Sequence, residues 1–231
     1  MTELQGAGRP LNRMRRVIGR RMRDSMTSKP HVTLHGQAEC SGLVEMCLLE
    51  QISLTAGLVS VVGRVLSEHP ELNAWLVDDR LIECDSIDVG VAVDIPGGLV
   101  VPVIRAVDQL APAEVAERLS DLARRARAQE LGTEDVVDAT FTVSTLGSLG
   151  VQYFTPIISP PQVAILGVGT LESRLTLDVG SLREEQVLSM SLSFDHAALD
   201  GVPAARFLKA LSSAVKDAAQ GASERRHQEV P

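Results

Sequence analysis

The sequence VLSMSLSFDHAALDG at residues 187–201 decides the fold and holds the most informative side chains of the chain. Apolar and small polar residues alternate over 187–194, which is the pattern of a β-strand with one buried face. His196 comes where that alternation stops, and Asp200 follows four residues later. Because apolar residues then recur at helical spacing, the stretch predicts a strand, a tight corner with a histidine and an aspartate, and a helix over 203–218.

The side chains at this corner suit general-base catalysis. Neutral histidine is the side chain whose ordinary pKa, about 6.5, lets it accept a proton near neutral pH. The residues alone leave a second interpretation open, in which His196 is an ordinary turn residue and Asp200 is the N-cap of the following helix. The pattern His-x-x-x-Asp-Gly does not separate these two interpretations by itself.

Length and composition indicate one folded domain. The chain has 231 residues, of which 45% are apolar, and this is enough for a sizeable core. Residues 1–9 and 218–231 show no apolar periodicity, so we expect a flexible arm, a folded domain at 10–217 and a disordered tail.

The same composition excludes several classes of protein. A net charge of −8 and only 3% aromatic residues argue against nucleic-acid binding. The sequence shows no apolar run of about 18 residues and no signal peptide, so we expect no membrane contact and a cytoplasmic location. The cysteines lack C-x-x-C spacing and lie in apolar or strand-like stretches, which indicates buried free thiols rather than disulfides or a metal site; they are Cys40, Cys47 and Cys84.

Periodicity divides the rest of the chain into helices and strands. The predicted helices are 12–25, 41–48, 54–66 and 112–130. The predicted strands are 31–39, a hairpin at 75–84, 87–93, 99–105 buried on both sides, 140–147 before a glycine-rich loop, and a hairpin at 173–188. Arginines surround the apolar face of helix 12–25, which we interpret as a solvated basic face, with binding of a CoA phosphate or a neighbouring subunit as the alternative.

The corner and several other phrases resemble one family. DHAALDG at 195–201, followed by AARFL at 204–208, is similar to the C-terminal signature of the dihydrolipoyl acyltransferase (E2) catalytic domains, and the same motif occurs in the related fold of chloramphenicol acetyltransferase. Four further phrases match in the same order: PHVT at 30–33, PELNA at 70–74, LVVPVIR at 99–105 and FTPIISPPQVAILGVG at 154–169. The resemblance covers 10–217, which is identified as an acyltransferase catalytic domain.

The resemblance implies a fold, an assembly and a set of site residues. Members of this family fold as a mixed α/β (α+β) sheet flanked by helices, assemble as trimers and build the active site between two subunits. A hydroxyl residue on one strand stabilises the oxyanion of their tetrahedral intermediate, and Ser144 is the matching position. The resemblance makes His196 the general base and Asp200 the residue that holds its corner. Coenzyme A, as acyl-CoA, is the implied co-substrate, without a metal, and the residues that bind it stay open.

Three departures from the family pattern affect the functional hypotheses. Ala197 follows the histidine where the acyltransferases carry arginine. Cys47 stands in the place of an arginine that pairs with the motif aspartate, and the segment after it is shortened at 50–53. An arginine between 9 and 23 is then left as a substitute partner for Asp200. The sequence also starts at the catalytic domain, without a lipoyl domain, a subunit-binding domain or a Pro-Ala-rich linker.

Three functions follow from these observations, and we rank them in order. The first is a stand-alone acyl-CoA-dependent acyltransferase that acetylates a hydroxyl of a small natural product in antibiotic biosynthesis, like the E2-like enzymes that act on tetronates in polyketide pathways. The second is a dihydrolipoamide acyltransferase core whose lipoyl domain lies on another chain. The third is a catalytically idle assembly core. All three predict a homotrimer or a larger cage.

Overall fold

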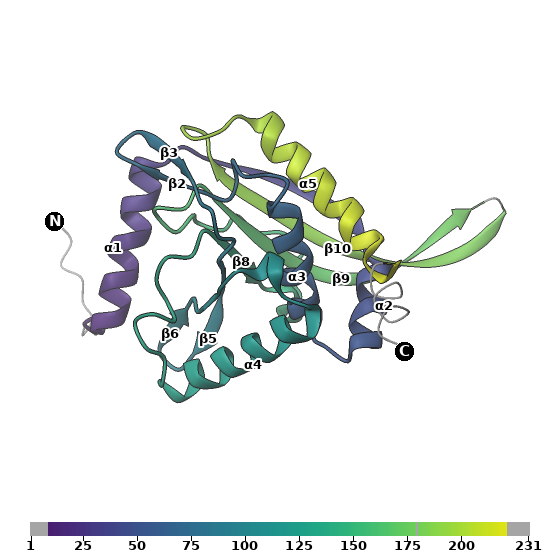
Figure 1. Cartoon of the computed structure of the whole chain (residues 1–231), viewed down its shortest axis with the longest axis horizontal. Coiled ribbons are helices and arrows are strands. Elements are labelled where there is room, and N and C mark those ends of the chain that lie inside the picture. The colour runs from purple at the N-terminus through teal and green to yellow at the C-terminus, as the bar shows by residue number, and fades with distance from the viewer. Residues whose placement is uncertain (1–8, 179, 221–231) are drawn as a thin grey trace, which may run out of the picture.

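A computed structural model describes residues 9–178 and 180–220 as a six-stranded mixed sheet with helices packed on it (Figure 1). The order across the sheet is β1 (His31–Glu39), β10 (Ser181–Asp195), β9 (Ala164–Asp178), β8 (Phe141–Thr145), β4 (Val89–Val91) and β7 (Val103–Ile104). The pairs β9–β8 and β8–β4 are parallel, and the other pairs are antiparallel. The predicted mixed α/β sheet flanked by helices is therefore confirmed.

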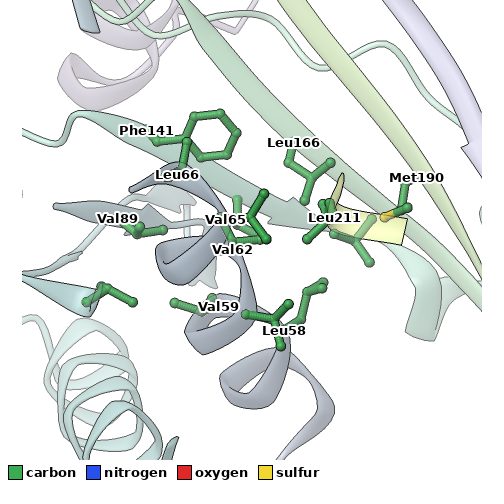
Figure 2. Close-up of a cluster of buried hydrophobic side chains, with 14 of the residues drawn as sticks. Leu58, Val59, Val62, Val65, Leu66, Val89, Phe141, Leu166, Met190 and Leu211 are labelled. Atoms are coloured by element: carbon green, nitrogen blue, oxygen red, sulfur yellow. The ribbon is translucent and has the colours of Figure 1, made fainter. Parts of the chain in front are cut away.

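Helix α3 is the centre of the hydrophobic core. It is one of four helices that pack together beside the sheet, with bounds α2 (Ser41–Glu50), α3 (Leu54–Leu66), α4 (Pro112–Ala128) and α5 (Gly201–Lys216). The hydroxyl of Ser53 accepts a hydrogen bond from the backbone N–H of Ala56 (3.2 Å) and caps α3. Apolar side chains on several sides of α3 are buried against the sheet and α5, as Figure 2 shows for Val62, Phe141 and Leu211. Ten of the thirteen residues of α3 are buried, as expected for a helix in the centre of the core.

The opposite face of the sheet is polar and is covered by an irregular segment, 151–162. Along β10 the apolar residues point to the helices, whereas Ser189, Ser191, Ser193 and Asp195 alternate with them and are also buried. The segment approaches the backbone so closely that a Cβ on Gly167 would lie 2.9 Å from the Phe154 ring. The polar face of β10, which the segment 151–162 covers, therefore ends at Asp195, next to His196.

Two short hairpins lie beside the main sheet, β2 (Ala74–Val77) with β3 (Arg80–Glu83) and β5 (Val93–Ile95) with β6 (Gly98–Val100). The first confirms the hairpin predicted at 75–84. The prediction of one strand over 99–105, buried on both sides, was wrong. Pro102 has no N–H for a strand ladder, so β6 ends before it and β7 begins after it, and Leu99 is 45% exposed.

An ion pair holds the loop that precedes β8. Arg105 Nη1 donates to Oδ2 of Asp88 (2.9 Å), and the same guanidinium donates to three backbone carbonyls of residues 134–138. Burial opposes ionisation of the Asp88 carboxyl, but hydrogen bonds from Ser86, the Ala106 N–H and Arg105 outweigh it and lower its pKa. The 3-10 helix η1 (Val107–Gln109) follows directly.

Both ends of the described chain differ slightly from the predicted boundaries. Helix α1 (Arg13–Ser28) stands at the end of the sheet where the corner lies (Figure 1), and it continues three residues beyond the prediction of 12–25. The predicted arm and tail fall mostly on 1–8 and 221–231, outside the described residues. Ala218 and Ala219 are buried, so the packed chain continues past the predicted boundary at 217.

Within 9–178 and 180–220, no single helix has the length and apolarity to cross a bilayer. Helices α2 and α3 meet the criterion only when taken together, and they are bent by 113° at the break between them.

Candidate active site

The histidine corner is built by the ends of three segments. β10 ends at Asp195, residues 196–198 form a turn, and α5 begins at Gly201. The backbone N–H of His196 donates to the carbonyl of Pro30 (2.9 Å), which ties the turn to the connection between α1 and β1. The imidazole lies beside the Phe194 ring, with centroids 5.8 Å apart, and it is exposed in the single chain. The backbone of the corner is fixed while the reactive ring stays accessible.

A buried ion pair lies directly beneath the histidine. Lys29 Nζ donates to Oδ2 of Asp195 across 2.8 Å, and the two side chains are 6% and 0% exposed. The other carboxylate oxygen accepts from the N–H of Ala197 (3.0 Å), and the Asp195 carbonyl accepts from the N–H groups of residues 198 and 199. Neither residue was predicted from the sequence, where the only signal was a charge at the end of an apolar strand and another at the end of a helix.

His31 is a structural histidine of the same corner. Its Nε2 accepts a hydrogen bond from the backbone N–H of Ile158 (3.1 Å), and an amide N–H can only donate. The proton of the neutral ring therefore lies on Nδ1, which donates to the carbonyl of Lys29 (2.8 Å). Both ring nitrogens are used, so His31 joins the corner to the segment 151–162 rather than serving as a base.

Asp200 occupies the N-cap position of α5 but makes no capping hydrogen bond through its side chain. Its carboxylate is exposed, and among the described residues no ion pair to it is found. Within this chain Cys47 does not lie near Asp200. α2 packs at the other end of α5, where Gly42 meets the carbonyl of Lys216, and a helix of this length spans about 24 Å.

Ser144 lies on β8, on the sheet face away from the helices. Val143 belongs to the core on the helix side, so its neighbours Thr142 and Ser144 point the other way. Thr142 Oγ1 donates to Oε1 of Gln162 (2.7 Å), which belongs to the covering segment. Ser144 is half-buried and pairs with Gly167 of β9. The hydroxyl therefore faces the polar side of the sheet.

The strand register separates Ser144 from His196 within one chain. Ser144 is level with Gly167, and Gly167 is level with Ser191 on β10, five residues before the histidine. At about 3.3 Å per residue along a strand and about 4.8 Å between strands, the two side chains are roughly 19 Å apart. A base and an oxyanion donor must both reach one carbonyl group, so a single chain cannot use these two together.

Two cavities open near the end of β8, on the helix side of the sheet. Their volumes are about 670 and 380 Å³, and Thr55, Thr145 and Ser148 line both. Ser144 faces the opposite side and lines neither cavity. Over the described residues no group of three or more His, Cys, Asp or Glu side chains could hold a metal ion.

The three thiols are free, and two of them are buried. Burial raises the pKa of the Cys47 thiol to about 11 and that of Cys40 to about 12. Burial also raises the pKa of Cys84, which is only partly buried. The prediction of buried free thiols is therefore confirmed for Cys40 and Cys47 and is wrong for Cys84.

The basic helix α1 touches the covering segment through two of its side chains. Ser25, its one buried residue, donates from Oγ to the carbonyl of Ile158 (2.6 Å), and Arg21 Nη2 donates to the carbonyl of Pro160 (2.6 Å). The remaining arginines of the helix are exposed. Whether they bind a phosphate or are solvated stays a prediction.

The chain matches the protein family described as 2-oxoacid dehydrogenases acyltransferase (catalytic domain) over residues 5–221. A similar curated protein is the dihydrolipoyllysine-residue acetyltransferase component of the acetoin cleaving system of Bacillus subtilis, 35% identical over 222 residues. Another is the mitochondrial dihydrolipoyllysine-residue succinyltransferase component of the 2-oxoglutarate dehydrogenase complex of Bos taurus, 35% identical over 220 residues. These alignments cover 91% and 90% of this chain, but 55% and 48% of the relatives. The chain thus spans about half their length.

Solved structures agree with this match. One was determined to study the role of a serine, a histidine and an asparagine in the catalytic mechanism of Azotobacter vinelandii dihydrolipoamide acetyltransferase; it is 32% identical, with a TM-score of 0.86 and 92% of each chain covered. A structure of the cubic core of a pyruvate dehydrogenase multienzyme complex gives the same values. Chloramphenicol acetyltransferase, at 16% identity and a TM-score of 0.54 over 87% and 94% of the two chains, shares the fold alone.

These relatives overturn the function that we ranked first. They are dihydrolipoyllysine acyltransferases of dehydrogenase and acetoin systems, and at 35% identity they match the second hypothesis rather than an acetyltransferase for a small tetronate-type hydroxyl acceptor. That ranking rested on three departures from the family pattern: Ala197, Cys47 and a sequence that starts at the catalytic domain. The hydrogen bond at position 197 comes from the backbone N–H of Ala197, so it does not depend on the side chain at that position.

Proposed function

The chain belongs to the 2-oxoacid dehydrogenase acyltransferase family, as its catalytic domain, and from this we propose that it transfers an acyl group between coenzyme A and the thiol of a dihydrolipoyl group. One observation carries the proposal to particular residues. The serine, histidine and asparagine studied in the Azotobacter vinelandii enzyme are separated by the same intervals as Ser144, His196 and Asp200.

The site is built from two copies of the chain. His196 of one copy lies on an exposed corner, and roughly 19 Å separate it from its own Ser144. A neighbour that turns its β8 toward the corner would supply the missing hydroxyl. Contacts between different surfaces of successive copies close into a ring, and we propose a trimer, alone or within a larger cage.

His196 and Ser144 have different roles in the thioester exchange. Neutral His196 takes the proton from the attacking thiol, and the resulting thiolate adds to the thioester carbonyl to form a tetrahedral oxyanion. Ser144 of the neighbour donates a hydrogen bond to that oxyanion. The intermediate collapses, the carbon–sulfur bond to the departing thiol breaks, and the imidazolium returns its proton to the leaving thiolate. The acyl group passes directly between two bound thiols, so no acyl-enzyme is formed.

Asp200 has a supporting role in this scheme. Asparagine stands at the same interval in the Azotobacter vinelandii enzyme, so a negative charge is not required there. At the first position before α5 the carboxylate is favourable for the helix dipole, by about 0.3–1 kcal/mol. Asp200→Asn should therefore cost little rate, and its effect should be on the stability of the corner.

Purified protein mixed with acetyl-CoA or succinyl-CoA and dihydrolipoamide tests the proposal. Acyl-dihydrolipoamide should form in wild-type samples and should fall by about 10²–10⁴ in the His196→Ala variant. Absence of transfer to dihydrolipoamide by a correctly assembled wild-type protein would reject the proposal, and so would an acyl group found on the protein after acyl-CoA alone. The two acyl donors also identify the acyl group, because the similar relatives include both acetyl- and succinyltransferases. A cytoplasmic location remains part of the proposal.

A further inference from the structure

The Lys29–Asp195 ion pair has no part in the scheme above, yet it is buried directly beneath the catalytic histidine. Lys29 caps the C-terminus of α1 and Asp195 is the last residue of β10. They are 166 positions apart in the sequence and only 2.8 Å apart in space. Two charges taken out of water are costly unless their geometry is good and their remaining hydrogen-bonding atoms are satisfied.

Each partner of the pair fixes one side of the histidine backbone. The Asp195 carboxylate accepts the N–H of Ala197 (3.0 Å), and its own N–H donates to the carbonyl of Val163 (2.8 Å). On the other side, Pro30 directly follows Lys29, and its carbonyl accepts the N–H of His196 (2.9 Å). One ion pair therefore joins the residues on both sides of His196 to the connection between α1 and β1.

The charges around the corner are few. On the strand and turn these are Asp195 and Asp200, and on the α1–β1 connection they are Lys29 and the neutral His31. The first turn of α5 and residues 156–163 carry no charged side chain. Lys29 and Asp195 balance one another, so the imidazole lies beside a pair with no net charge.

We propose that Lys29 and Asp195 are positioning residues for His196. The ion pair holds the corner so that the imidazole faces the neighbouring copy, and neither member of the pair is left as an unbalanced buried charge beside it. This role rests on the proposed function, in which His196 is the base. It differs from a merely structural role because removal of one partner changes the electrostatic environment of the imidazole in a predictable direction.

Two single variants give opposite electrostatic changes. Lys29→Met leaves a carboxylate beside the imidazole, which favours the protonated ring and moves its titration to higher pH. Asp195→Asn leaves an ammonium group and moves the titration to lower pH. The expected shift is about 0.5–1 pH unit in each direction. The double variant removes both charges and should return the titration to its wild-type position.

The titration is measured by proton NMR on the assembled protein, with His196→Ala used to assign the resonance. Rate measurements should show kcat lowered about 10- to 100-fold in both single variants with KM for acyl-CoA nearly unchanged, since a misplacement of about 1 Å can cost that much. Lys29→Arg should recover most of the rate because it keeps the charge and the donor. Arg105→Met is the matched control, because it breaks an ion pair of similar length away from the corner.

Three results would overturn the proposal. The first is a folded Lys29→Met protein whose kcat stays within about twofold of wild type and whose His196 titration does not move. The second is movement of that titration in the same direction in both single variants. The third is an equal loss of kcat in Arg105→Met. If the wild-type protein transfers no acyl group, the proposed function fails, while the NMR titrations still decide whether the ion pair controls the histidine.

Discussion

Two inactive variants of this chain should rescue one another when they assemble together. Within one copy, Ser144 and His196 are roughly 19 Å apart, too far to act on one carbonyl. A Ser144→Ala chain keeps its histidine, and a His196→Ala chain keeps its serine. An interface that takes the histidine from the first and the serine from the second therefore holds a complete site.

The size of the rescue follows from the geometry of a ring. Each interface of a cyclic trimer takes His196 from one chain and Ser144 from the next. When the two variants are mixed equally and assemble at random, about one interface in four has both intact residues. We expect a kcat per chain of about a quarter of the wild-type value, against about 10⁻² or less for either variant alone.

The assay is transfer from acetyl-CoA or succinyl-CoA to dihydrolipoamide after co-expression, with the trimer or cage checked by light scattering. Variants that are assembled separately and then mixed should show only the sum of their residual rates. Wild-type chains co-assembled with a Ser144→Ala/His196→Ala chain calibrate the mixing, because a shared site gives about a quarter and a site within one chain gives about a half. Co-assembled single variants that stay at the sum of their residual rates would refute the two-copy site.

Three further predictions concern single sites. Ser144→Ala should lower kcat by about 10²–10³ with little change in KM, whereas Ser144→Thr should be tolerated, and steady-state kinetics on the assembled protein decides this. Asp88→Asn should destabilise the fold at pH 7 by about 1–3 kcal/mol in denaturant unfolding. Because the pKa of Asp88 is lowered in the folded state, that difference should hold above about pH 4 and fade as the pH drops through the folded value. The native thiols should react with a disulfide reagent at pH 8 far more slowly than free cysteine, and burial of Cys40 and Cys47 is the reason; labelling at the unfolded rate would contradict it.

Local patterns in the sequence predicted the elements that build the site. The alternating pattern within 187–194 and its break at His196 predicted the end of β10, and the helical spacing after it predicted α5. The same reasoning failed at 99–105, because an apolar run does not show that Pro102 interrupts the ladder. Periodicity reports which residues favour burial, and it does not report which strand a segment pairs with.

The ion pair and the separation of the catalytic residues were beyond such patterns. Lys29 and Asp195 meet only because β1 lies antiparallel to β10 with His31 level with Asp195. The distance between Ser144 and His196 likewise depends on register across β8, β9 and β10. The family resemblance identified Ser144 and His196, but the distance between them follows only from the strand register of the sheet.

The exposure of His196 is itself an argument for a site completed by a second copy. A base that faces open water competes with solvent for the thiol proton, and hydrogen bonds to an oxyanion are weak at high dielectric. In the single chain the imidazole and the Asp200 carboxylate both lie at the surface, while the ion pair beneath them is buried. The rigid part of the corner is therefore complete within one chain, and the reactive part is open on the side where a partner would lie. Covering that side with the β8 face of a neighbour excludes water and brings Ser144 to the carbonyl in one step, so assembly and catalysis become a single requirement.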